Sequence, residues 1–243
     1  MCSSEETIVR IEDGIGYLLL NRPGKANAYS DAMITTMDEA VDRFAADTSV
    51  KAIVIGSAVA GRFCAGADLD EIRSRSKPDA FKIPSMALFD RIEALPQPTV
   101  AAIGGPAVAG GLELALACDL RLATADAHFA LPETGLGIIP AAGGTWRLPR
   151  VVGQPLARQI ILFGRELDGE EAVQAGLADL LVPGDKLMDE ARSWALRAAN
   201  RDPLATQLAK AALGRAHGSA TGREFVEECQ SKLYGRPDLG GSE

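Results

Sequence analysis

The chain has 243 residues, of which 47% are hydrophobic and 24% charged, a composition typical of globular proteins and unlike that of disordered chains. This length allows one large domain or two small ones with a buried apolar core. The 25 basic and 33 acidic residues leave a net charge of −8, which argues against a broad nucleic-acid-binding surface.

Cysteine usage and hydropathy indicate a cytoplasmic protein without a membrane partner. The four cysteines have no CxxC spacing, and two histidines cannot complete a zinc pattern, so we expect reduced thiols and no metal. The first residues lack the basic start and apolar stretch of a signal peptide. The uncharged stretch from Pro98 to Leu112 contains Gly and Pro and is too short to cross a membrane.

Three mostly apolar runs predict buried strands at residues 15–21, 52–56 and 99–103, and a fourth strand is expected at residues 120–123. After the first run, apolar residues recur at helical spacing from Met33 to Phe44 and predict a helix over residues 31–45. Apolar strands that alternate with helices indicate a sheet covered on both faces, and hence an α/β fold.

The second half of the chain is predicted to be mostly helical. Asp168 followed by Glu171 matches a capping box, and Gly176 suits the position just after a helix end. Two further helices with Ala-rich faces are predicted over residues 185–200 and 203–216.

Two Gly-rich segments, at residues 62–69 and 104–114, are candidate functional loops. In the first, Asp68 is positioned to cap a short helix over residues 69–74, although a plain strand-to-helix turn would have the same pattern. In the second, a helix begins near Gly110, where N–H groups without shielding side chains form a natural oxyanion site. Neither segment matches Gly-x-Gly-x-x-Gly or a P-loop, so dinucleotide or triphosphate binding is not supported.

Two glutamates are candidate catalytic residues. Glu113 is the only charge between Pro98 and Cys118, where a carboxylate costs free energy unless it is paired or hydrated. It is either a glutamate favoured by the first turn of a helix or a carboxyl with a tuned pKa. Glu133 is either a solvated loop residue or a second carboxyl that holds one water together with Glu113. His128 and His217 compete as bases, but neither lies in a recognisable nucleophile setting.

An ordered series of motifs resembles the enoyl-CoA hydratase/isomerase (crotonase) superfamily. The resemblance covers about residues 8–235, and the order of the motifs is far more specific than any one of them. The matching segments lie at residues 21–28, 63–69, 98–113, 117–119, 129–133, 137–145, 147–153 and 172–177.

This resemblance implies a crotonase-like (ClpP/crotonase) spiral of β-β-α repeats, followed by a C-terminal helical region that builds a homotrimer or a dimer of trimers. We accordingly predict a spiral core with the active site over residues 1–190 and an oligomerisation region over residues 191–243. The implied substrate is an acyl-CoA thioester, with no other cofactor because coenzyme A is part of the substrate.

The resemblance also implies roles for individual residues. The amides of Ala67 and Gly110 match the oxyanion donors, and Glu113 and Glu133 match the two glutamates of hydratases. This pair implies syn addition of water to a trans-2-enoyl-CoA. Alternatives are a Δ3,Δ2-enoyl-CoA isomerase, a specialised acyl-CoA dehydratase, or a non-catalytic acyl-CoA-binding or RNA-binding member. Substrate and CoA contacts are implied at Lys25, Ala26, Ala28, Ala65, Asp68, Leu69 and Ala141.

Some positions depart from the family pattern. Ala141 and Trp146 stand where Gly and Gln are common, and Asp70 replaces a frequent basic residue. The chain ends where many relatives continue into a helix with CoA contacts, so Arg22 and Lys25 are expected to contribute more to CoA binding. The segment over residues 73–92 is expected to cover the acyl pocket, with candidate acyl contacts at Phe81, Met86 and Phe89, of which Phe89 also suits core packing.

Overall fold

A computed structural model describes residues 6–215 and 220–234, and these residues form two β-sheets surrounded by helices. The described strands are β1 (Thr7–Glu12), β2 (Ile15–Leu20), β3 (Ala52–Ser57), β4 (Thr99–Ile103), β5 (Pro106–Val108), β6 (Leu120–Ala123), β7 (His128–Ala130), β8 (Leu167–Asp168) and β9 (Leu180–Leu181). The described α-helices are α1 (Asp31–Ala46), α2 (Leu69–Ser74), α3 (Pro84–Ala94), α4 (Gly110–Leu116), α5 (Gly144–Phe163), α6 (Gly169–Gln174), α7 (Leu187–Ala199), α8 (Pro203–Arg215) and α9 (Ala220–Ser231). Short 3-10 helices are η1 (Pro23–Lys25), η2 (Lys77–Phe81), η3 (Glu133–Leu136) and η4 (Gly184–Lys186).

The larger sheet has the strand order β1-β2-β3-β4-β6-β9, and the smaller sheet has the order β5-β7-β8. Strands β1 and β2 form an antiparallel hairpin, whereas the remaining pairs of the larger sheet are parallel. The chain passes twice from the larger to the smaller sheet and then into a helix, through β4-β5-α4 and through β6-β7 to α5. This alternation confirms the predicted β-β-α repeats.

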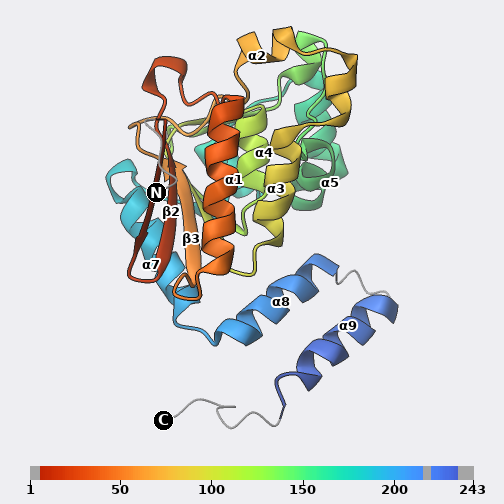
Figure 1. The fold of residues 1–243 in the computed structure, drawn as a ribbon. Helices are drawn as coiled ribbons and strands as arrows, with labels where there is room; N and C mark the ends of the chain where they lie inside the picture. Colours follow the sequence, from red (N-terminus) through yellow and green to blue (C-terminus); the bar gives the residue numbers. More distant parts are fainter. Residues whose placement is uncertain (1–5, 216–219, 235–243) are drawn as a thin grey trace.

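Helices cover both faces of the larger sheet, as Figure 1 shows, with α1, α3 and α4 on one side and α7 on the other. Strand β2 shows the consequence, because all six of its residues are buried. Leu18 and Leu20 pack in the core on the α1 side, while Ile15, Tyr17 and Leu19 pack with α7. Successive side chains of a strand point to opposite faces, so a strand buried on both sides is apolar throughout.

The helix ends agree with their local sequence signals. Asp68 caps α2 by accepting from the Asp70 amide, and the capping box of Asp168 and Glu171 begins α6. Gly176 has a φ of +72° just after α6, as its predicted position beyond a helix end requires. Gly153 interrupts helix α5 with a φ of +75°.

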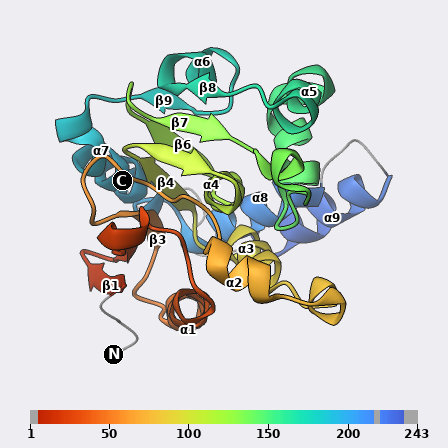
Figure 2. The same ribbon diagram turned by 90° about the horizontal axis from the view of Figure 1, so that it is seen from above.

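The last helices leave the sheet layers. Helix α7 packs on the larger sheet through Ala191 and Ala195, so the predicted boundary between residues 190 and 191 falls inside this helix. Helices α8 and α9 then form a hairpin at the end of the molecule opposite α2 (Figures 1 and 2). The Lys210 ammonium fixes α8 by donating to Asp119 at 2.7 Å and to the Gln97 carbonyl at 3.0 Å. A role for this hairpin in oligomerisation stays a prediction.

Candidate active site

A cavity of about 640 Å³ lies between the carboxyl ends of the strands, the α2–α3 segment and η3. In Figure 2, α3 lies beside α4. The wall is mostly apolar, and the carboxyls of Glu113 and Glu133 both border it. The other residues at the wall are Tyr29, Ala65, Ala67, Leu69, Ile72, Arg75, Ser76, Asp79, Ala80, Ile83, Ser85, Val108, Ala109, Gly110, Pro132, Leu136, Ile138, Ile139, Ala141 and Ala142.

The Gly-rich loops lie side by side because their backbones bond to each other. The Cys64 amide donates to the Pro106 carbonyl at 3.0 Å, and the Val108 amide donates to the Cys64 carbonyl at 3.0 Å. Tyr29 holds the first loop from the other side, since its amide donates to the Gly66 carbonyl and its carbonyl accepts from the Asp68 amide. These bonds fix the backbone on both sides of residue 67.

The amides of Ala67 and Gly110 donate no hydrogen bond within the described part of the chain, although both residues border the cavity. Gly66 brings them together: it has a φ of +91°, and a methyl group on it would lie 3.0 Å from the Gly110 nitrogen. Ala109 precedes the second amide with a φ of +53°, an uncommon and strained conformation for a residue with a side chain. The strained backbone thus presents two unpaired N–H donors, those of Ala67 and Gly110, to the same cavity.

Glu113 lies on α4 and is only 3% exposed. One oxygen, Oε1, accepts from the amides of Ala142 and Gly144, both at 2.8 Å. Burial raises the pKa of this carboxyl above its usual range, while the two amides and the charge of Arg147 act in the opposite direction. The amides therefore fix the orientation of Glu113 and favour its ionised form against the effect of burial.

Arg147 supports the position of Glu113 through the loop that precedes α5. Its guanidinium is buried and donates to the Ala142 carbonyl at 3.0 Å, to Glu93 at 2.9 Å and to Asp90 at 2.5 Å. Because the same loop supplies an amide to Glu113, Arg147 holds the hydrogen-bonding partner of that carboxyl in position. The sequence did not indicate that Arg147 holds the loop next to Glu113, because a single arginine in the 147–153 motif does not reveal its partners.

Glu133 begins η3 and is 5% exposed. Its Oε2 has no hydrogen-bond partner among the described residues. Burial raises the pKa of this carboxyl to about 7, and the charge of Glu113 contributes in the same direction. The two glutamates therefore share one cavity but differ in environment: one is held by amides, and the other retains an unpaired oxygen and is half-protonated near neutral pH.

The structure divides the predicted substrate contacts into two groups. Ala65, Leu69 and Ala141 border the cavity together with the proposed donors and carboxyls. Lys25, Ala26, Ala28 and Asp68 lie outside its wall, and contact between these residues and CoA stays a prediction.

The two basic residues expected near CoA are already paired with carboxylates. Arg22 donates to Asp68 at 2.8 Å and to Glu6 at 2.9 Å, and its side chain is only 19% exposed. Lys25 lies 2.9 Å from Asp70 and 3.5 Å from Asp68. Arg22 thus has a structural role in holding the Asp68 cap, whereas the half-exposed Lys25 ammonium remains accessible.

The segment over residues 73–92 borders the cavity, but through other side chains than those predicted. Phe81 is 90% exposed, Met86 packs against the core, and Phe89 is fully buried in it. None of the three borders the cavity. Instead, Arg75, Ser76, Asp79, Ala80, Ile83 and Ser85 do so. The 3-10 geometry of η2 decides which side chains face inward, and the sequence did not indicate it.

The competing bases are not brought to this cavity. His128 lies on β7 and pairs with Glu166 at 2.9 Å, away from the cavity wall, and His217 falls outside the described residues. Trp146, which stands where Gln is common in the family, packs its ring near the Arg147 guanidinium, with 5.3 Å between the ring centre and the guanidinium carbon, and does not border the cavity. Within residues 6–215 and 220–234, no group of three or more His, Cys, Asp and Glu residues could hold a metal ion, and no helix could span a membrane.

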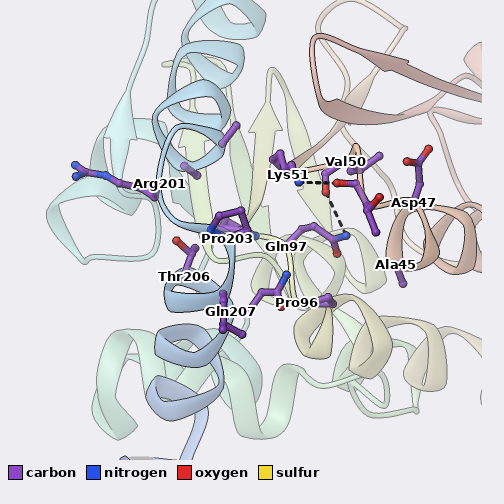
Figure 3. A pocket seen from close by; sticks show the side chains of 15 residues that line it. Ala45, Asp47, Val50, Lys51, Pro96, Gln97, Arg201, Pro203, Thr206 and Gln207 are labelled. Atoms are coloured by element: carbon purple, nitrogen blue, oxygen red, sulfur yellow. Dashed lines mark hydrogen bonds between the residues drawn. The ribbon is translucent and has the colours of Figure 1, made fainter. Parts of the chain in front are cut away.

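A second cavity, of about 380 Å³, lies between the end of α1, the Pro96–Pro98 turn and the start of α8 (Figure 3). Gln97 borders it and donates to the Phe44 carbonyl at 2.8 Å. Glu113 and Glu133 do not border this second cavity, and neither do Ala67 and Gly110. It therefore lacks both the two carboxyls and the two amides that the first cavity combines.

Comparison with known proteins identifies the family. Residues 10–234 match the family model "Enoyl-CoA hydratase/isomerase". The chain belongs to the enoyl-CoA hydratase/isomerase family.

Relatives and solved structures agree with this assignment. The chain is 41% identical to an Arabidopsis thaliana protein named "Probable enoyl-CoA hydratase 2, mitochondrial", over 93% of this chain and 77% of that one. It is also 41% identical to the human "Methylglutaconyl-CoA hydratase, mitochondrial", over 93% of this chain and 69% of that one. The crystal structure of enoyl-CoA hydratase from Bacillus anthracis has a TM-score of 0.91 and 32% identity, and the match covers 96% of this chain and 92% of that one. The fold is therefore the predicted crotonase fold.

Proposed function

We propose that this protein is an enoyl-CoA hydratase, which reversibly adds water to the double bond of a trans-2-enoyl-CoA with syn geometry. The observation that supports this activity is the meeting of two buried carboxyls, Glu113 and Glu133, at one cavity. Hydration needs one group to accept a proton from water and another to supply a proton to carbon. A shared cavity with two carboxyls of different environment provides both.

The thioester carbonyl oxygen is proposed to lie between the amides of Ala67 and Gly110. Attack at C3 moves negative charge onto this oxygen and forms an enolate-like transition state. Donors that are already aligned stabilise that charge without reorganisation, and one such donor contributes roughly 3 kcal/mol. The backbone bonds around residue 67 and the strained Ala109 supply this alignment.

The attacking water is proposed to lie between the two carboxyls. The Glu113 carboxylate accepts a proton from the water as its oxygen bonds to C3. The protonated Glu133 donates its proton to C2, so the double bond becomes a single bond and a 3-hydroxyacyl-CoA results. Proton exchange then restores the starting charges. The pair titrates together, and a pKa of about 7 at Glu133 makes its protonated form available at neutral pH.

The rest of the substrate is proposed to follow the mostly apolar wall. Ile72, Ile83 and Ile138 face the cavity and suit a hydrocarbon acyl chain, which is bound by the removal of apolar surface from water. Ala26, Ala28, Ala65, Asp68, Leu69 and Ala141 are proposed to surround the thioester and the adjoining part of CoA. The half-exposed Lys25 is the proposed phosphate contact.

The test follows the absorbance of the conjugated thioester during incubation with trans-2-enoyl-CoAs. The series should contain short, medium and branched acyl groups and methylglutaconyl-CoA, which gives a human relative its name. We expect the absorbance to fall and a 3-hydroxyacyl-CoA to form. Absence of any loss across the series would exclude the proposed activity.

Single-atom variants test the two-carboxyl mechanism. Glu113→Gln and Glu133→Gln should each reduce turnover by a factor of roughly 100 or more, because each removes one proton-transfer group. Glu39→Gln, at an exposed position on α1, is the matched control and should keep wild-type turnover. If either active-site variant turns over normally, the mechanism is wrong. A 3-enoyl-CoA in the same assay detects isomerase activity, because the conjugated absorbance would then appear.

The same proposal includes three further points. They are catalysis without another cofactor, assembly as a trimer or a dimer of trimers, and a cytoplasmic location. Size measurement of the purified protein in solution tests the assembly, and dialysis against a chelator before the assay tests the cofactor prediction.

A further inference from the structure

Tyr29 is a cavity residue that the sequence motifs did not indicate, although it follows Ala28 directly in the chain. It is 4% exposed, and its ring packs edge-on against Phe89 at 6.0 Å between ring centres. Its backbone is bonded to Gly66 and Asp68, on either side of the Ala67 amide. Ring and backbone are therefore both fixed next to the unpaired donors.

The hydroxyl of Tyr29 lies against Gly110. A methyl group on the α-carbon of Gly110 would be only 1.9 Å from the phenol oxygen, so glycine is required here for close approach. The α-carbon is bonded to the nitrogen whose N–H is unpaired. An acceptor that binds to the Gly110 amide therefore lies near the Tyr29 hydroxyl as well.

The Ser85 hydroxyl, at the start of α3, interacts with the Tyr29 hydroxyl and acts to lower the pKa of the phenol. Each of the two hydroxyls carries one proton, so an interaction between them engages at most one of the two protons. Within the described residues, neither hydroxyl has a further partner, and both residues border the cavity. One hydroxyl proton thus remains for an acceptor in the cavity.

The surroundings keep Tyr29 a donor. Burial, followed by the negative charge of Glu113, raises the pKa of the phenol above its usual value. A phenol that stays protonated can stabilise negative charge that develops on a neighbouring oxygen.

We propose that the Tyr29 hydroxyl is a third donor to the thioester oxygen, beside the amides of Ala67 and Gly110, and that Ser85 is a positioning residue that orients it. This inference rests on the proposed hydratase function. It assigns a catalytic role to the side chain at position 29, whereas the two other donors are backbone groups.

Tyr29→Phe tests the donor, because it removes the hydroxyl and keeps the ring on Phe89. We expect kcat to fall roughly 10- to 100-fold with KM changed less than about threefold, since the bond strengthens as charge develops on the oxygen. Ser85→Ala should cause a smaller fall in kcat, because the phenol remains but loses its orienting partner. Tyr17→Phe is the matched control, since Tyr17 is 2% exposed in the core on the α7 side, and it should keep wild-type kinetics.

The infrared carbonyl stretch of a bound enoyl thioester distinguishes a direct hydrogen bond from a packing effect. In Tyr29→Phe this frequency should rise toward that of the free thioester, while Tyr17→Phe should leave it unchanged. An unchanged frequency in Tyr29→Phe would overturn the proposal even if kcat falls, and so would an unchanged kcat. If the wild-type protein fails to hydrate any enoyl-CoA, the proposed function is wrong. If wild type and Tyr29→Phe hydrate equally well, only the role of Tyr29 is wrong.

Discussion

Replacing Glu133 with glutamine should stabilise the protein at alkaline pH while it removes activity. Burial raises the pKa of Glu133 in the folded chain from an ordinary value of 4.5 to about 7. Between these two values the unfolded chain releases the proton and the folded chain retains it. The free energy of unfolding therefore falls as pH rises through this window, by about 3 kcal/mol in total at about 1.4 kcal/mol per pKa unit. A glutamine carries no charge at any of these pH values and avoids this loss.

Urea unfolding at a series of pH values from 4 to 8 measures the effect. Wild type and Glu133→Gln should have similar stability near pH 4, and the variant should be about 3 kcal/mol more stable at pH 8. Glu39→Gln, on the exposed face of α1, is the control and should show no such pH-dependent gain. A stability difference between Glu133→Gln and wild type that stays constant from pH 4 to 8 would refute the raised pKa of Glu133 in the folded chain.

Three further changes test the geometry of the site. Glu113→Gln should remain folded by thermal unfolding while turnover is lost, since the amide oxygen can still accept from the loop amides; collapse of the fold would contradict this reading. Gly110→Ala should abolish turnover even in a Tyr29→Phe background, because the added methyl would also lie 2.8 Å from the ring carbon that bears the hydroxyl. Arg147→Met should lower the free energy of unfolding by about 1–3 kcal/mol, because it removes the buried donor to the Ala142 carbonyl while the half-exposed Asp90 and Glu93 carboxylates stay hydrated. Arg165→Met, at a half-exposed pair, should change it by less than about 1 kcal/mol in the same urea titration.

The sequence by itself predicted the features that depend on neighbouring residues. The continuous apolar runs at β2, β3 and β4 indicated strands buried on both faces, and the structure confirms them. The caps at Asp68 and Asp168 were predictable because a capping side chain bonds to an amide only two or three residues away. The family also followed from sequence, since an ordered series of short motifs identified it.

Tertiary structure decided which of these residues meet. Glu113 and Glu133 are 20 positions apart in sequence, and the packing of α4 against the loop before α5 places both carboxyls at one cavity. Packing also turned Phe81 outward and placed the Tyr29 hydroxyl against Gly110. The local sequence pattern predicts whether a segment is helix or strand, because the spacing of apolar residues follows the period of each element. The pKa of a carboxyl and the partner of a hydroxyl depend instead on burial and on charges from distant segments, which only the folded chain brings together.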